Sequence, residues 1–158
     1  MNNGELTLKT GAIYLQINRG KRIMKTLESK IVSIKRLDED IYKVLSDFQN
    51  FTPYAQQAKL ENWEAGEDWC KFEVQGIKEA GLRIIEKEPN KTIKFTGNEK
   101  IPFEFYVWIQ LKQVAPYDTR MKITVKAKLN MMMKMLVGSK LKTGIDSLAD
   151  QIATAFSQ

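Results

Sequence analysis

The sequence contains no histidine and a single cysteine, Cys70. Without histidine the chain cannot build a Ser-His-Asp or Cys-His nucleophilic site, and no imidazole is present to ligate a metal. Any acid–base chemistry would have to use carboxylates, lysine, tyrosine, Cys70 or bound water. A lone cysteine cannot form an internal disulfide, which is typical of a reducing compartment, so we expect a cytoplasmic location.

Long hydrophobic runs are also missing. No apolar stretch approaches the roughly 20 residues that a helix needs to span a bilayer. The first 22 residues lack a continuous apolar segment followed by a small-residue cleavage site. We therefore expect neither a transmembrane segment nor a secretory signal.

Acidic residues are absent from 120–142, which holds seven basic residues in a chain of net charge +6. Two interpretations are open. The run forms the solvated outer faces of a strand and a helix, or it meets an acidic partner or an anionic surface. The sequence shows no signature of a specific nucleic-acid site, a metal site or a cofactor.

The residues present are those of one globular domain, because 158 residues with 43% hydrophobic and 28% charged content can bury a sizeable core. Residues 1–23 read as an N-terminal extension in which 6–18 alternates loosely, and 24–158 as the domain itself. The end of the chain, 130–156, predicts one long helix with a single buried face. Its apolar residues recur at steps of three and four: Met133, Val137, Leu141, Ile145, Leu148, Ile152 and Phe156.

The start of the domain predicts a strand followed by two short helices. Residues 26–36 are rich in Ile and Val, as strands are. Asp38 is the expected N-cap of a helix that presents Ile41 and Phe48 on its apolar stripe. Thr52-Pro53 opens a second helix that runs to about Ala58.

A meander of six antiparallel strands is predicted next, because turns this short cannot accommodate a parallel crossover. Phe105, Val107 and Ile109 alternate with polar residues most clearly. We place one of the turns at Glu79-Ala80-Gly81. The expected strands are 59–63, 69–78, 82–88, 92–97, 103–114 and 120–129.

This order, opened by KIVSIKRLDEDIYKVLSDFQNFTPY at 30–54, resembles the START-like or Bet v 1-like (SRPBCC) superfamily, which includes polyketide cyclase/dehydrase-like proteins. The resemblance covers about residues 24–158 and rests on fold signals, with no catalytic motif to carry over. It implies an α+β helix-grip fold. In that fold a curved seven-stranded antiparallel sheet surrounds the C-terminal helix, two short helices follow the first strand, and a hydrophobic cavity lies between sheet and helix.

We expect the cavity to be lined by inward-facing apolar residues and by the Met-rich start of the long helix, because methionine adapts to varied apolar shapes. Packing inside an ordinary core is the competing interpretation for each of them, and Cys70 is expected to be a buried, inert thiol. The predicted lining is Phe72, Val74, Phe95, Phe105, Val107, Ile109, Met121, Ile123, Met132, Met135 and Leu136, and the entrance candidates are Tyr54, Trp63 and Trp69.

Three functions follow from this picture, and the first is our leading hypothesis. The first is a binding or carrier domain for a hydrophobic small molecule that is lipid-like or polyketide-like, with no catalytic residue and no cofactor. The second is a cyclase- or dehydratase-type enzyme, which would need an ionisable side chain facing the cavity. The third is a protein-interaction module that uses the basic surface of 120–142.

Overall fold

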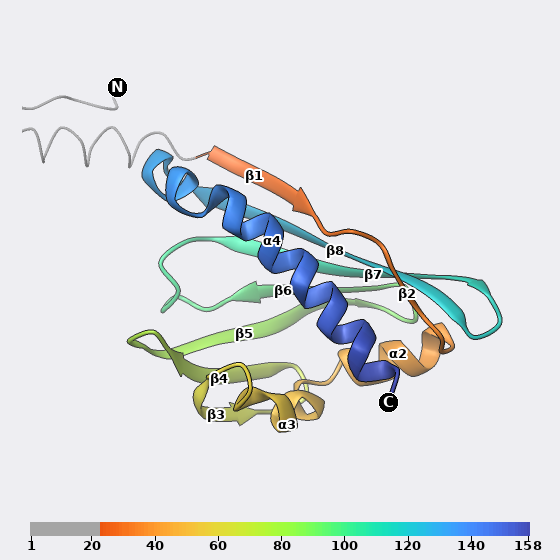
Figure 1. The fold of residues 1–158 in the computed structure, drawn as a ribbon. Coiled ribbons are helices and arrows are strands. Elements are labelled where there is room, and N and C mark those ends of the chain that lie inside the picture. Colours follow the sequence, from red (N-terminus) through yellow and green to blue (C-terminus); the bar gives the residue numbers. More distant parts are fainter. Residues whose placement is uncertain (1–22) are drawn as a thin grey trace, which may run out of the picture.

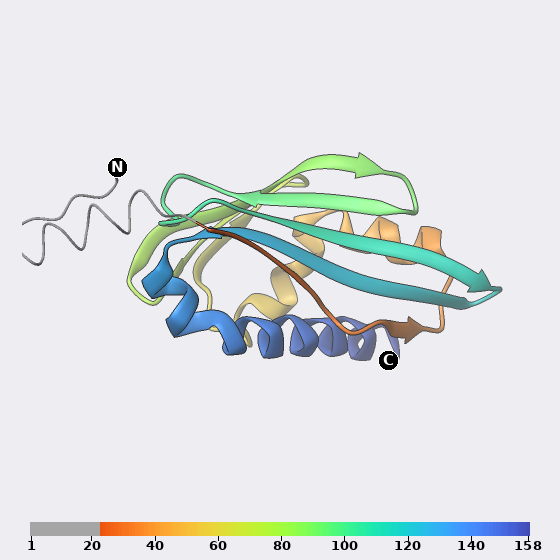
Figure 2. The same ribbon diagram turned by 90° about the horizontal axis from the view of Figure 1, so that it is seen from above.

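The computed structural model of the protein describes residues 23–158, with the side chains at 23, 132, 133 and 136–138 left aside. One curved antiparallel sheet holds the strands in the order β1-β8-β7-β6-β5-β4-β3, and β2 also pairs with β8 (Figures 1 and 2). The strands are β1 (Ile23–Glu28), β2 (Val32–Ile34), β3 (Glu61–Ala65), β4 (Trp69–Val74), β5 (Ile77–Glu88), β6 (Thr92–Gly97), β7 (Phe105–Ala115) and β8 (Asp118–Leu129). The helices are α2 (Asp38–Leu45), the 3-10 helix η1 (Phe48–Phe51), α3 (Thr52–Ala55) and α4 (Met131–Phe156).

The first predicted strand is present but interrupted. Glu28 pairs with Thr124 and Val32 with Met121, so three residues of this strand oppose two of β8. Ser29 bridges the irregularity, because its N–H donates to the carbonyl of Ile123 and its hydroxyl accepts from the N–H of Ile123. The extra residue bends the strand and divides it into β1 and β2, as β-bulges do.

The short helices lie where the sequence predicts them, with shifted ends. Leu37, and not Asp38, is the N-cap residue of α2, and the N–H of Asp38 donates to the side chain of Gln113. The acidic first turn still complements the helix dipole. The predicted helix stops before Phe48, because the Asp47 carboxylate accepts from the N–H of Gln49 and starts η1.

The six-stranded meander is confirmed, but the turn expected at 79–81 is wrong. The chain turns instead at Gln75-Gly76, whose φ angles of 49° and 83° suit a two-residue hairpin turn. β5 then runs without a break through 79–81. Gly81 is needed there for space, because a Cβ would lie 2.6 Å from the carbonyl oxygen of Cys70.

The long C-terminal helix is confirmed as α4, 26 residues that cross the sheet (Figure 1). It is clamped along one flank to the segment between β1 and β2. Asp146 accepts from the N–H of Lys30 at 2.7 Å, and the Lys142 ammonium donates to the carbonyl of Glu28 at 2.8 Å. Lys30 also pairs with Asp150 at 2.6 Å. α4 is therefore held beside β1, β2 and β8 rather than centred on the sheet.

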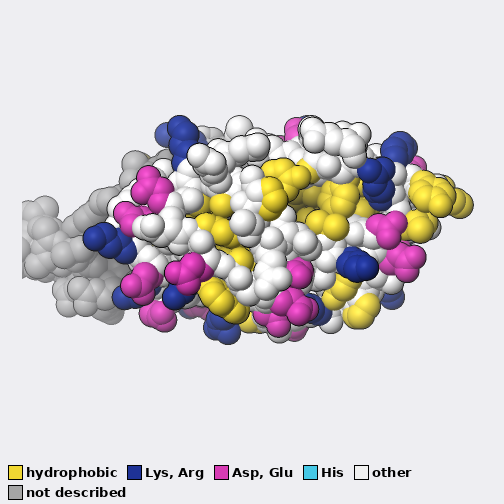
Figure 3. Space-filling model, turned by 90° about the horizontal axis from the view of Figure 1, so that it is seen from below, with side chains coloured by type: hydrophobic (Ala, Val, Ile, Leu, Met, Phe, Trp, Pro, Cys, Tyr) yellow, Lys and Arg dark blue, Asp and Glu magenta, His cyan; other side chains and the backbone are white. Residues whose placement is uncertain are grey.

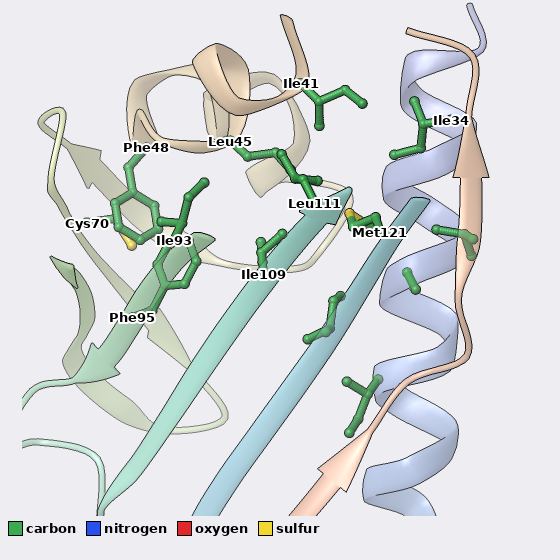
Figure 4. Close-up of a cluster of buried hydrophobic side chains, with 14 residues drawn as sticks. Ile34, Ile41, Leu45, Phe48, Cys70, Ile93, Phe95, Ile109, Leu111 and Met121 are labelled. Atoms are coloured by element: carbon green, nitrogen blue, oxygen red, sulfur yellow. The ribbon is translucent and has the colours of Figure 1, made fainter. Parts of the chain in front are cut away.

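The core joins all of these elements. Figure 4 shows Ile41, Leu45 and Phe48 of the short helices above the sheet residues Ile93 and Ile109, with α4 and β2 completing the cluster.

The division into an extension of 1–23 and a domain of 24–158 stays a prediction. Most of that extension, including the loosely alternating segment 6–18, lies outside the described residues, while Ile23 begins β1 opposite Leu129.

Candidate ligand-binding groove

Two cross-strand rows of side chains define the concave face of the sheet. Residues that pair across neighbouring strands point to the same face, so the register shows which side chains stand next to one another. The first row, which we call the covered row, consists of Ser29, Ile123, Ile109 and Ile93. The second, two residues along each strand, we call the open row, and it consists of Leu27, Val125, Val107, Phe95 and Ile84.

The covered row is sealed. Ile123 and Ile93 have no exposed surface, and Ile109 and Ser29 are also buried. Ile41, Leu45 and Phe48 from the short helices and Ile145 and Ala149 from α4 share one cluster with its apolar members. No guest could touch this row without displacing those side chains.

The open row is only partly covered. Leu27, Val125, Val107 and Ile84 remain half-buried, although they pack against the core, and only Phe95 is buried. The two rows are separated by about 6.7 Å along the strands. The concave face of the sheet therefore changes from sealed to accessible over two residues of each strand.

The half-buried apolar surface continues to the far edge of the sheet. The rings of Trp63 and Phe72 stack with 6.2 Å between centroids and 19° between planes. The Trp63 indole N–H donates to the hydroxyl of Thr52, which ties β3 to α3. From the side where β3 and α3 lie, hydrophobic side chains gather in a hollow of the surface (Figure 3). Other half-buried residues that pack against the core are Phe51, Ala65, Leu82, Ile152 and Phe156.

The flank of α4 opposite the clamp made by Lys142 and Asp146 is uncovered. Leu148 belongs to the predicted apolar stripe of the helix but is 44% exposed. Gly144 lies one turn before it, and a Cβ added there would meet nothing within 4 Å. We call the space between this flank and the open row the groove.

No protein-family model matches the chain, and no curated protein matches it. Solved structures do match. Norcoclaurine synthase from Thalictrum flavum is similar over 90% of this chain and 91% of that one, at 16% identity and a TM-score of 0.70. The same synthase in complex with dopamine and hydroxybenzaldehyde is similar over 88% and 90%, at 16% identity and a TM-score of 0.66. A START superfamily protein from Mycobacterium smegmatis is similar over 84% and 98%, at 16% identity and a TM-score of 0.55.

The chain has the START-like, Bet v 1-like helix-grip fold. The fold class predicted from the sequence is thereby confirmed. The predicted sheet has seven strands, and its first strand is divided here into β1 and β2. The sheet therefore contains eight strand segments.

Within this START-like fold the predicted lining residues separate into groups. Phe95, Ile109, Met121 and Ile123 are fully buried in the core, whereas Phe72 and Val107 are half-buried on the groove surface. Val74 and Phe105 are half-buried at strand ends. Met135 is 80% exposed and therefore faces solvent at the start of α4. The side chains of Met132 and Leu136 lie outside the described residues.

The three entrance candidates do not come together. Trp63 faces the groove through its stack on Phe72. Trp69 neighbours the buried Cys70 in β4 and is 43% exposed, so it points to the opposite face, where its indole covers Gly66. Tyr54 is exposed on α3. Sequence reasoning missed Leu82 and Ile84, because the misplaced turn at 79–81 hid their continuous alternation with Ala80.

The interior of the described part holds no buried Asp, Glu, Lys or Arg. Burial raises the pKa of the Cys70 thiol to about 11, which keeps it protonated and inert. Burial likewise raises the pKa of Tyr42 in α2. Residues 23–158 contain no group of three potential metal ligands.

The basic stretch of 120–142 is largely neutralised. Arg120 pairs with Asp118, Lys122 with Glu28, Lys128 with Glu104, and Lys142 with Asp146, so four of its seven cations have carboxylate partners.

Two surface depressions lie elsewhere. One, of about 410 Å³, is formed by the loop between β6 and β7, and the other, of about 500 Å³, lies between α2 and Asn90. Neither adjoins α4. Among residues 23–158 no helix is long and apolar enough to cross a bilayer.

Proposed function

We propose that the protein is a binding or carrier domain that holds a hydrophobic small molecule in the groove between the open row and α4. The observation that carries the proposal is the open row itself. Four of its five apolar side chains are left half-covered next to a sealed core. Burial of these groups against a guest would release about 25 cal/mol per Å² before the costs of association.

The fold supports this proposal in general terms, since one similar solved structure is norcoclaurine synthase in complex with dopamine and hydroxybenzaldehyde. The stacked pair of Trp63 and Phe72 offers a flat apolar surface at the edge of the groove. No polar side chain of the core points to a particular ligand, so the proposal names a lipid-like or polyketide-like guest by its apolar character.

An acid–base enzyme of the cyclase or dehydratase type finds less support. Such an enzyme needs a positioned group of suitable pKa in contact with the substrate. The five side chains of the open row are all apolar, and the Cys70 thiol of the core is protonated. The interaction module finds less support because four of the seven cations in 120–142 are paired with carboxylates.

The test is titration with the neutral fluorescent probe N-phenyl-1-naphthylamine. We expect saturable binding, and Ile84→Gln should weaken it about tenfold, because a polar amide would face the guest. The matched control is Ile85→Gln, since Ile85 is the next residue of β5 but is exposed at 37% outside the core. Equal effects of the two variants, or no binding by the parent protein, would refute the proposal.

Native mass spectrometry of freshly purified protein can identify the guest. A carrier should retain an apolar molecule whose mass adds to that of the chain, and the Ile84→Gln variant should retain less of it. A library of candidate substrates that the protein converts to products would favour the enzyme instead.

A further inference from the structure

Two lysines occupy positions that the alternation of β1 and the periodicity of α4 reserve for apolar residues. They are Lys25 in β1 and Lys134 in α4, and both are half-buried. Neither position is explained by the proposed binding of a purely apolar guest.

Lys25 stands on the concave face of the sheet. It pairs across the ladder with Ala127, which is buried, and it precedes Leu27 of the open row by two residues. Its neighbours Met24 and Thr26 point to the opposite face and are exposed. The lysine stem thus continues the apolar surface of the groove toward the β1 edge.

Lys134 stands on the sheet-facing stripe of α4. It precedes Leu141 by seven residues and the buried Ile145 by eleven, which places all three on one face of the helix. Met131, three residues before it, and Met135, the residue after it, are exposed. Among these three described side chains, Lys134 is the one that faces inward.

The two lysines lie at the same level of the groove. Lys142 contacts Glu28 and Asp146 contacts Lys30, so α4 and β1 advance in the same direction. Going back from Lys142 to Lys134 covers about 12 Å of helix, and going back from Glu28 to Lys25 covers about 10 Å of strand. Figures 1 and 2 both show α4 and β1 starting at the same end of the molecule.

No carboxylate neutralises this pair. Glu28 is engaged by Lys122 and Asp146 by Lys142 and Lys30, and the ion pairs of residues 23–158 include neither Lys25 nor Lys134. Two half-buried lysines that have no carboxylate partner among residues 23–158 attract an anion more strongly than lysines that are already paired do.

We propose that Lys25 and Lys134 bind the anionic head group of an amphipathic ligand whose apolar part lies in the groove, as in a long-chain carboxylate. This inference rests on the proposed function, because the groove must first hold an apolar guest. Each ammonium donates charge-assisted hydrogen bonds to the head group, and the apolar chain extends over Leu27 and Val125.

The test compares cis-parinaric acid with its methyl ester, which share one fluorescent apolar chain and differ in charge. The parent protein should bind the acid about tenfold more tightly than the ester, and added salt should reduce this preference. Replacing both lysines, Lys25→Met with Lys134→Met, should abolish the preference, while Lys25→Arg should retain most of it. Competition with dodecanoate and with monododecyl phosphate distinguishes a carboxylate from a phosphate head group.

Lys140→Met is the matched control, because Lys140 is an exposed lysine of the same helix. It should leave the preference for the acid unchanged. Equal affinities for acid and ester, or a preference that survives the double replacement, would overturn the inference and leave the proposed function standing. If neither probe binds, the proposed function itself has failed.

Discussion

The covered row and the open row are built from the same kinds of residue, on the same face of the same strands, yet only one of them can meet a guest. Ile109 and Ile123 are sealed, whereas Val107 and Val125, two residues along the same strands, are half-covered. Strand alternation determines that all four point inward. What differs is the layer above them.

That layer is uneven because its pieces are attached at one end of the sheet. α2 and η1 place Ile41, Leu45 and Phe48 over the covered row, and the C-terminal half of α4 adds Ile145 and Ala149. The clamp between α4 and the segment 28–30 holds the helix to one side. A groove remains where the curved sheet continues beyond these pieces, because a straight helix cannot follow the whole curve.

The largest difference should appear when one residue of each row is truncated. Ile123→Ala should lower the free energy of unfolding by about 2–5 kcal/mol, since a sealed site cannot refill the cavity. Ile84→Ala should cost about 1 kcal/mol, because its side chain is already half-exposed in the native state. Urea denaturation followed by tryptophan fluorescence measures both. Losses of equal size would show that the two rows are equally packed.

Two glycines sharpen the comparison with smaller effects. A Cβ on Gly97 would lie 2.5 Å from the ring of Phe105, so Gly97→Ala should destabilise by about 1–3 kcal/mol. A Cβ on Gly144 of α4 would meet nothing within 4 Å. Gly144→Ala should therefore stabilise the protein by up to about 1 kcal/mol, because alanine has a higher helix propensity than glycine. Thermal unfolding of the two variants reports the signs, and a loss with Gly144→Ala would contradict free space beside the helix.

The sequence predicts much of the fold and less of the site, for a physical reason. Alternation and helical periodicity follow from the local chain, so the meander, the short helices and α4 are predictable. The split of the first strand depends on Ser29 bridging to Ile123, a partner distant in sequence. The turn at Gln75-Gly76 was missed, because Glu79-Ala80-Gly81 has the more turn-like composition.

The lining of the groove depends on which elements cover which strands, and no local pattern contains that information. Met121 and Ile123 were expected to line a cavity, and the structure seals them beneath α4 and the short helices. Met135 is predicted to face inward, but it is exposed, and Lys134 faces inward instead. Composition alone gives no reason to expect a lysine on the inner face. A helical projection anchored on Ile145 could have found it.

Cys70 lies in the sealed part of the interior. The ionisation of its thiol therefore reports whether this part stays closed to water. The thiol pKa is about 11 in the folded protein and about 9 in the unfolded chain, where it is solvated. Stability is therefore complete below pH 9 and falls as the pH rises, because only the unfolded chain then releases the proton. By pH 10 the loss should be about 1 kcal/mol. The Cys70→Ala variant should lack this part of the alkaline loss, and Ellman's reagent should label native Cys70 only after unfolding.

The smallest expected effect concerns the clamp that keeps α4 to one side. The N–H of Lys30 and the ammonium of Lys142 hold the pKa of Asp146 below its usual value. A lowered pKa means that this carboxylate stabilises the fold at neutral pH and loses that contribution as the pH falls through the acidic range. Asp146→Asn should therefore lower the melting temperature slightly at pH 7, and the variant and the parent should converge as the pH falls below the lowered pKa of Asp146. Asp150→Asn on the next turn is the control for the Lys30 ion pair alone. A difference between Asp146→Asn and the parent that does not shrink as the pH falls would mean that packing, rather than the charged clamp, sets the position of the helix over the groove.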